Sequence, residues 1–165
     1  MPIINAILPE LDQEAKTTLR VLERVPAEHL SWTPHVKSSS LGKLAWHIAS
    51  IPAVVQKLLQ AGAFDLAQAR PQQDIPQDTG AIVAEFRRNS DATREYLSTL
   101  SDAFLHEPFT MIRGGQTVMT IPKVAVVRTI LMNHTYHHRA QLAVYLRLLD
   151  VPVTAIYGTS ADEPM

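Results

Sequence analysis

The sequence predicts an all-α protein, a four-helix bundle with long loops. Four segments of about twenty residues repeat apolar side chains every three or four positions, as amphipathic helices do. Proline- and glycine-rich stretches separate these segments, and only one short region favours β-strands. A chain of 165 residues is long enough to bury one sizeable core, so we expect a single domain over residues 1–165.

The first helix is predicted from about Ile3 to Val25. Pro9 lies inside it and either distorts the first turn or marks where the regular helix begins. The second helix is predicted to begin after Ser40, whose hydroxyl is a good N-cap. Pro52 is expected to kink this helix. The inward face of the helix consists of Leu41, Leu44, His47, Ile51, Val54 or Val55, and Leu58.

A long connection is predicted at residues 62–80, which contain prolines and glutamines without an apolar repeat. Asp78 or Thr79 is expected to cap the third helix. Its inward face consists of Ile82 or Val83, Phe86, Ser90, Thr93, Leu97 and Leu100. Two β-prone pieces, 109–112 and 117–120, flank a Gly-Gly pair and predict a small β-hairpin before the last helix.

The fourth helix is predicted from Pro122, which suits a first helical turn, to about Leu149. Its inward face consists of Val127, Leu131, His134, His138, Gln141 or Leu142, Tyr145 and Leu149. His134 and His138 are four residues apart, so their side chains are neighbours on one helix face, about 5–6 Å apart at Cβ.

Three histidines thus occupy predicted core faces: His47, His134 and His138. Neutral imidazole binds zinc, nickel, copper or iron, and three protein ligands with one open position are typical of catalytic metal sites. The alternative is that these imidazoles are ordinary core side chains, because two histidines at this spacing often occur by chance. His137 is a competing ligand on the same helix.

Three other histidines, two tyrosines and several polar side chains are expected to have structural roles and no part in the metal site. We expect His29, His35 and His106 to be solvated in loops, and Tyr136 and Tyr145 to pack. Arg139 and Gln141 are interpreted as helix-surface groups. A steering role toward an anionic substrate is open to Arg113, Arg139 and Lys37.

The composition argues against several classes of partner. The formal charge is −1, from 15 basic and 16 acidic side chains, so no broad basic surface for nucleic acid or anionic membrane is expected. The apolar runs are too short to span a bilayer, and the N-terminus does not resemble a signal peptide. The chain has no cysteine, which excludes disulfides, thiolate zinc sites and cysteine nucleophiles and fits a cytoplasmic location.

Several stretches together resemble the DinB/YfiT family of metal-dependent helical bundles. They are residues 39–49 (SSLGKLAWHIA), 134–142 (HTYHHRAQL), 153–163 (VTAIYGTSADE) and 32–34 (WTP). The resemblance implies an up-down-down-up four-helix bundle, often a homodimer. It also implies a metal held by His47, His134 and His138, and so favours His138 over His137. Dimerisation is further suggested by residues 124–127, which are apolar nearly all round.

The family includes thiol-dependent S-transferases that use mycothiol, bacillithiol or glutathione, and maleylpyruvate isomerase; its YfiT branch is described as hydrolytic. The resemblance therefore implies a metalloenzyme that activates a thiol or water for transfer or hydrolysis on a small molecule. The alternative is a non-catalytic metal-binding or interaction bundle. Zinc and nickel are favoured over iron and manganese, with a low-molecular-weight thiol as a second cofactor. No catalytic or cofactor-binding side chain is identified, so the reacting group would be a water or thiolate at the open position.

Overall fold

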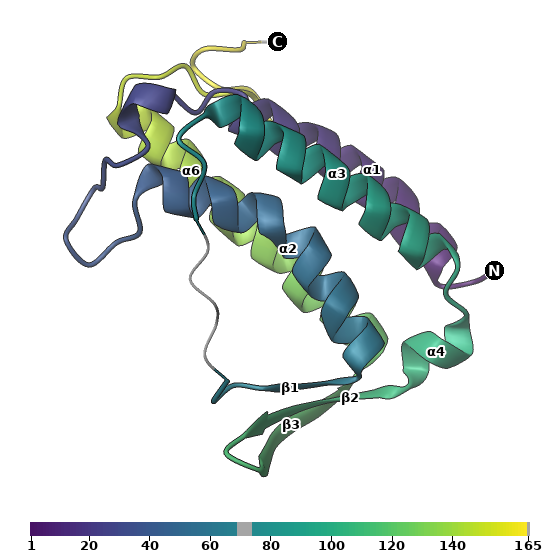
Figure 1. Ribbon diagram of the computed structural model, residues 1–165. Helices are drawn as coiled ribbons and strands as arrows, with labels where there is room; N and C mark the ends of the chain where they lie inside the picture. Colours follow the sequence, from purple (N-terminus) through teal and green to yellow (C-terminus); the bar gives the residue numbers. More distant parts are fainter. Residues whose placement is uncertain (69–73, 165) are drawn as a thin grey trace.

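The computed structural model describes residues 1–68 and 74–164, and four long helical segments dominate this part of the chain (Figure 1). They are α1 (Ile4–Leu22), α2 (Leu41–Ala61), α3 (Thr79–Ser98) and α6 (His134–Leu148). Helices α1 and α2 each pack against both α3 and α6. Residues 69–73 of the predicted long connection lie outside the described residues.

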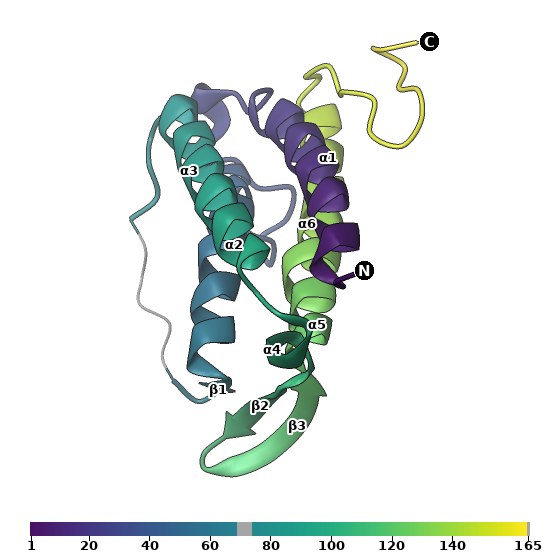
Figure 2. The same cartoon turned by 90° about the vertical axis from the view of Figure 1, so that its right-hand side faces the viewer.

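A small sheet lies at one end of the bundle, and the C-terminal tail lies at the other (Figure 2). Helix α2 leads directly into β1 (Ala63–Asp65), and α3 leads through α4 (Asp102–His106) into β2 (Pro108–Arg113). The start of α1 is also at this end, because the Ile3 N–H donates to Asp102 Oδ1 at 2.8 Å. Helices α2 and α3 therefore run toward the sheet, and α1 runs away from it.

Short polar side chains begin helices α2 and α3, as the sequence predicts. Ser40 Oγ accepts the Lys43 N–H at 3.3 Å, which confirms Ser40 as the N-cap of α2. Asp78, one of the two candidates, caps α3 through the Ala81 N–H at 2.9 Å. Helix α1 continues through Pro9, and α2 continues through Pro52.

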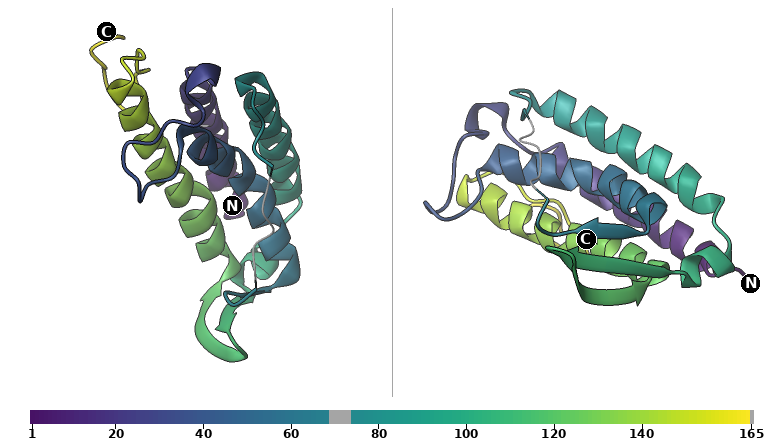
Figure 3. Two further views of the ribbon diagram at one scale, coloured as in Figure 1. Left: turned by 60° about the vertical axis from the view of Figure 1, so that its left-hand side comes forward. Right: turned by 60° about the horizontal axis from the view of Figure 1, so that its bottom comes forward.

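Strand β1 and two short helices were not predicted from the sequence. Strand β1 pairs parallel to β2, and β2 pairs antiparallel to β3 (Gln116–Pro122); Figure 3 shows β2 and β3 extending beyond the helix ends. Gly114 and Gly115 connect β2 to β3 with φ of 56° and 81°, values that glycine adopts without a steric penalty. The two unforeseen helices are α4 and the 3₁₀ helix η1 (Ala27–His29).

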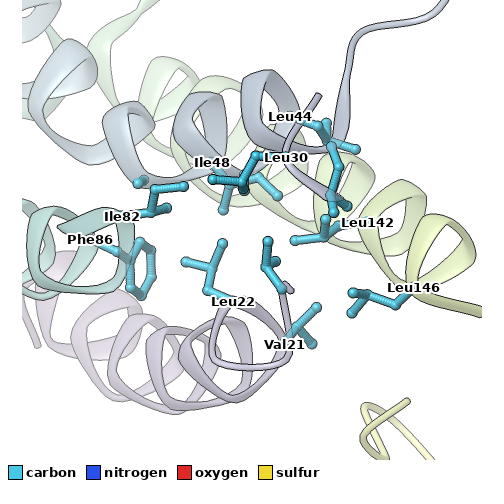
Figure 4. Close-up of a cluster of buried hydrophobic side chains, with 13 residues drawn as sticks. Val21, Leu22, Leu30, Leu44, Ile48, Ile82, Phe86, Leu142 and Leu146 are labelled. Carbon is cyan, nitrogen blue, oxygen red and sulfur yellow. The ribbon is translucent and has the colours of Figure 1, made fainter. Parts of the chain in front are cut away.

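The bundle contains two apolar clusters, one near each end. The tail-end cluster consists of Val21, Leu22, Val25, Leu30, Leu41, Leu44, Ala45, Ile48, Ala49, Ile82, Phe86, Leu142 and Leu146. The sheet-end cluster consists of Ile4, Ile7, Ile51, Val55, Leu59, Leu97, Leu105, Phe109, Val126, Val127, Leu131 and Met132. In Figure 4, side chains of the tail-end cluster from all four long helices point into one interior.

A polar middle layer separates the two clusters. Each long helix contributes apolar side chains to both clusters, and the polar groups lie between them along the chain. On α1 the sheet-end cluster ends at Ile7 and the tail-end cluster begins at Val21, so Glu14 lies between them. The same reasoning places His134 and His138 of α6 between the clusters, whereas His47 of α2 lies beside Ala45 and Ile48 of the tail-end cluster.

The last helical segment contains a π-helical turn that the sequence analysis did not foresee. It begins as α5 (Lys123–Val126), continues as the π-helix η2 (Val127–Asn133) and becomes α6 at His134. A π-helix bonds residue i to i+5, so one turn contains an extra residue. The buried residues of this segment are Lys123, Val126, Val127, Leu131, Met132, Thr135, Arg139, Leu142 and Leu146.

Beyond the π-turn the predicted inward face is therefore wrong by one residue, except at Leu142, which is buried as one of the two predicted alternatives. Val127 is followed by buried Met132, five residues later, and the buried face continues through Thr135 and Arg139. His134 and His138 lie at the edge of that face and are half-buried. This edge position leaves the two imidazoles accessible from outside the bundle.

Candidate metal centre

The structure brings His47 of α2 together with His134 and His138 of α6. One ligating nitrogen from each histidine lies within 4.8 Å of the others, and all three residues are half-buried. His134 Nε2 is 2.9 Å from His47 Nε2 and 2.7 Å from His138 Nε2. Two helices, α2 and α6, thus position three imidazoles with their Nε2 atoms converging.

Hydrogen bonds alone do not account for this convergence. An imidazole Nε2 has a single in-plane site, which holds either one proton or one lone pair. His134 Nε2 can therefore make one good hydrogen bond, yet it has two short contacts, to His47 and to His138.

A cation placed among the three nitrogens could accept a lone pair from each. A tetrahedral zinc ion with Zn–N distances of about 2.0–2.1 Å keeps its ligand nitrogens about 3.3 Å apart, so the contacts here would widen only by about half an ångström. The donor set and spacing therefore fit a divalent transition metal.

Gln141 is a neighbour of this site for which the sequence predicted no role toward the histidines. Its side chain is exposed, but its Oε1 lies 2.7 Å from His138 Nδ1. The spacing of three residues on one helix was the signal that could have revealed the contact. Burial lowers the pKa of His138 and favours neutral imidazole, the form that binds metals; Gln141 acts in the opposite direction.

His137 does not belong to the group of converging nitrogens. Its side chain is exposed, and its ring packs edge-on against the His138 ring with centroids 4.9 Å apart. Among the described residues, the only group of three metal-ligating side chains is that of His47, His134 and His138.

Arg139 is not on the helix surface, so that interpretation is wrong. Its side chain is 1% exposed and pairs with Glu14 of α1, with 2.7 Å between Nη2 and Oε2. It also donates to Thr18 Oγ1 at 3.1 Å and to the hydroxyl of Tyr157 in the tail at 2.5 Å. Because these groups engage the guanidinium, Arg139 is not available to steer a substrate.

The other predicted polar residues lie as follows. His29, His35 and His106 are exposed as expected, although His29 and His106 lie in short helices instead of loops. Arg113 is exposed at the end of β2, and Lys37 is exposed in the loop before α2.

The expected packing roles of Tyr136 and Tyr145 are confirmed. Tyr145 packs edge-on against Trp32, with ring centroids 5.6 Å apart. Tyr136 packs against the sheet-end cluster and donates to Glu10 Oε1 at 3.3 Å. Burial is the main cause that raises the pKa of the Tyr136 hydroxyl, and Glu14 and Glu10 raise it further.

The chain is 28% identical over 163 residues to YrdA of Bacillus subtilis, described as an uncharacterized protein; the match covers 97% of this chain and 91% of YrdA.

None of the helices in the described part of the chain has both the length and the apolar character needed to cross a membrane.

Two solved structures of DinB-like proteins share the fold. One, from Bacillus cereus, has a TM-score of 0.69 at 21% identity and covers 93% of this chain and 95% of its own. The other, YjoA from Bacillus subtilis, has a TM-score of 0.67 at 17% identity and covers 97% of this chain and 99% of its own. The sequence profile of the DinB family matches residues 3–164. The chain therefore belongs to the DinB family, as its motifs predicted.

Proposed function

We propose that this chain binds a divalent transition metal through His47, His134 and His138. We further propose that it uses the metal to activate a water or a low-molecular-weight thiol for hydrolysis or transfer on a small molecule. The observation that carries the proposal is the convergence of three Nε2 atoms from two helices at a half-buried site. Three protein ligands leave room for an exchangeable ligand, whereas structural zinc sites are usually closed by four.

The chain's own residues have separable tasks in this proposal. The three imidazoles hold the ion, and their half-buried position at the edge of the core lets a small molecule reach it. A bound divalent ion would supply Lewis-acid activation, which makes a water or thiol nucleophilic near neutral pH. Imidazole nitrogens favour zinc or nickel here, with iron and manganese as alternatives.

Activity of the reconstituted protein tests the catalytic part of the proposal. Zinc- or nickel-loaded protein would be assayed against electrophiles with a thiol, and against ester and amide panels, beside His47→Ala. Turnover by the loaded protein that is lost in His47→Ala supports a metalloenzyme. Metal binding without turnover on any panel would instead identify a non-catalytic metal-binding or interaction bundle.

A homodimer remains part of the proposal on the family resemblance alone. Val126 and Val127, part of the apolar run that suggested a dimer, are buried within the chain itself. Their burial removes that argument for a second copy. Size-exclusion chromatography with light scattering distinguishes a dimer from a monomer of 18.3 kDa.

A further inference from the structure

We infer that Gln141 is a positioning residue of the three-histidine site, one that fixes the orientation and tautomer of His138. The inference rests on the proposed metal function and deepens it. His138 has a nitrogen contact on each side of its ring: Nδ1 is 2.7 Å from Gln141 Oε1, and Nε2 is 2.7 Å from His134 Nε2. The two contacts together hold the ring between its neighbours.

The chemistry of the amide determines which proton His138 carries. An amide oxygen only accepts hydrogen bonds, so the contact with Oε1 places the ring proton on Nδ1. A neutral imidazole with its proton on Nδ1 has its lone pair on Nε2, the atom that faces His47 and His134. Gln141 thus presents His138 in the one neutral tautomer that can bind a metal through Nε2.

The location of Gln141 makes this role separable from folding. Its side chain is exposed and lies outside both apolar clusters, so its replacement leaves the core intact. Partners that orient metal-binding histidines change metal affinity by about 10- to 100-fold when they are removed. The effect of Gln141 is therefore expected in metal affinity and not in the stability of the metal-free protein.

Two substitutions at this position separate hydrogen bonding from packing. Gln141→Met keeps the length of the side chain and removes the acceptor, whereas Gln141→Glu keeps an acceptor oxygen. Val144→Glu adds the same charge at an exposed position one turn further along α6, and so controls for electrostatic attraction of the cation. All variants would be titrated with Zn²⁺ alone against a chromophoric chelator, and the metal-free forms would be unfolded in urea.

We expect Gln141→Met to bind Zn²⁺ about 10- to 100-fold more weakly than the wild type, with unchanged metal-free stability. Gln141→Glu should bind Zn²⁺ at least as tightly as the wild type. Any gain in affinity should be larger than the gain that Val144→Glu produces. Nitrogen NMR of the zinc-loaded wild type should show the His138 proton on Nδ1. Zinc affinity of Gln141→Met equal to that of the wild type would overturn the inference while the metal site stood. A wild type that binds no Zn²⁺, or that binds it equally after His134→Ala, would overturn the proposed function itself.

Discussion

Arg139 places a positive charge in the middle of the bundle, and Glu14 is the group that compensates it. The two side chains are 1% and 14% exposed, so water screens neither well. Thr18 and Tyr157 complete the hydrogen bonding, and the guanidinium carbon lies 5.1 Å from the centre of the Tyr157 ring. Such a pair is costly to break because removal of one partner leaves a buried charge alone.

The substitution Arg139→Met should therefore destabilise the protein by about 3–5 kcal/mol, measured by urea unfolding. Arg147→Met is the matched control on the same helix, because its partner Asp162 is solvent-accessible and water screens such surface pairs, so that they stabilise the fold little. Adding Glu14→Gln to Arg139→Met should recover part of the loss. If Arg139→Met costs no more than Arg147→Met, the buried pair does not stabilise the bundle.

At the scale of the element, the π-turn η2 determines which residues of the last helix reach the core. Val126 and Val127 are buried, and so are Leu131 and Met132, which follow each of them five positions later. The extra residue of a π-turn lets residues five positions apart face the same way, whereas a regular α-helix would turn them to different faces. The turn also ends directly before His134, the first metal-site residue of α6.

Deletion of the exposed Thr129 should convert the π-turn into regular α-helix and cost less than about 2 kcal/mol, because the residues on either side keep their facing. Deletion of the exposed Ala140 is the control. It rotates the rest of α6 by about 100° and moves Leu142 and Leu146 off the core, which should cost more than about 4 kcal/mol. Urea unfolding followed by circular dichroism measures the free energy of unfolding of both deletion variants. Equal losses of stability in the two variants would refute this explanation of the π-turn.

The C-terminal tail is a second element whose behaviour the structure predicts. Asp162 pairs with Arg147 and accepts the Val153 N–H at 2.8 Å, and these two contacts hold its pKa below the ordinary value. Glu163 accepts the Ala155 N–H at 2.9 Å and pairs with Arg20, and its pKa is lowered for the same reasons.

A carboxyl group with a lowered pKa stabilises its contacts above its ordinary pKa, and this stabilisation is lost as the pH falls through the lowered value. The tail should therefore stay docked at pH 5 and above, and release as the pH falls below about 4. Amide NMR of Val153 and Ala155 across an acid titration measures the release. Midpoints at or above the ordinary carboxyl values would contradict the assigned contacts.

At the scale of the whole molecule, the sequence was sufficient for features that depend on local periodicity and capping. The long helices, the Ser40 cap and the two longer strands follow from patterns within about twenty residues. The convergence of His47 with His134 and His138 was predicted because all three lie on or beside apolar helix faces.

Features that depend on distant partners were not accessible in this way. Strand β1 has three residues and is held by pairing with β2, which lies far along the chain. The burial of Arg139 follows from the π-turn and from Glu14 on another helix, and neither leaves a periodic signal. The same one-residue displacement moves His134 and His138 from the centre of the buried face to its edge.

The central claim is that His47, His134 and His138 bind a metal ion. It concerns the whole folded chain, because His47 of α2 meets the two histidines of α6 only when the bundle forms. Elemental analysis of the untagged protein as purified, beside His134→Ala/His138→Ala, tests it most directly. His29→Ala/His106→Ala, which removes two exposed histidines, is the control. We expect about one divalent transition-metal ion per chain in the wild type and in the control, and little in the site variant. Equal metal content in the site variant and the wild type would contradict the assignment of these histidines as metal ligands.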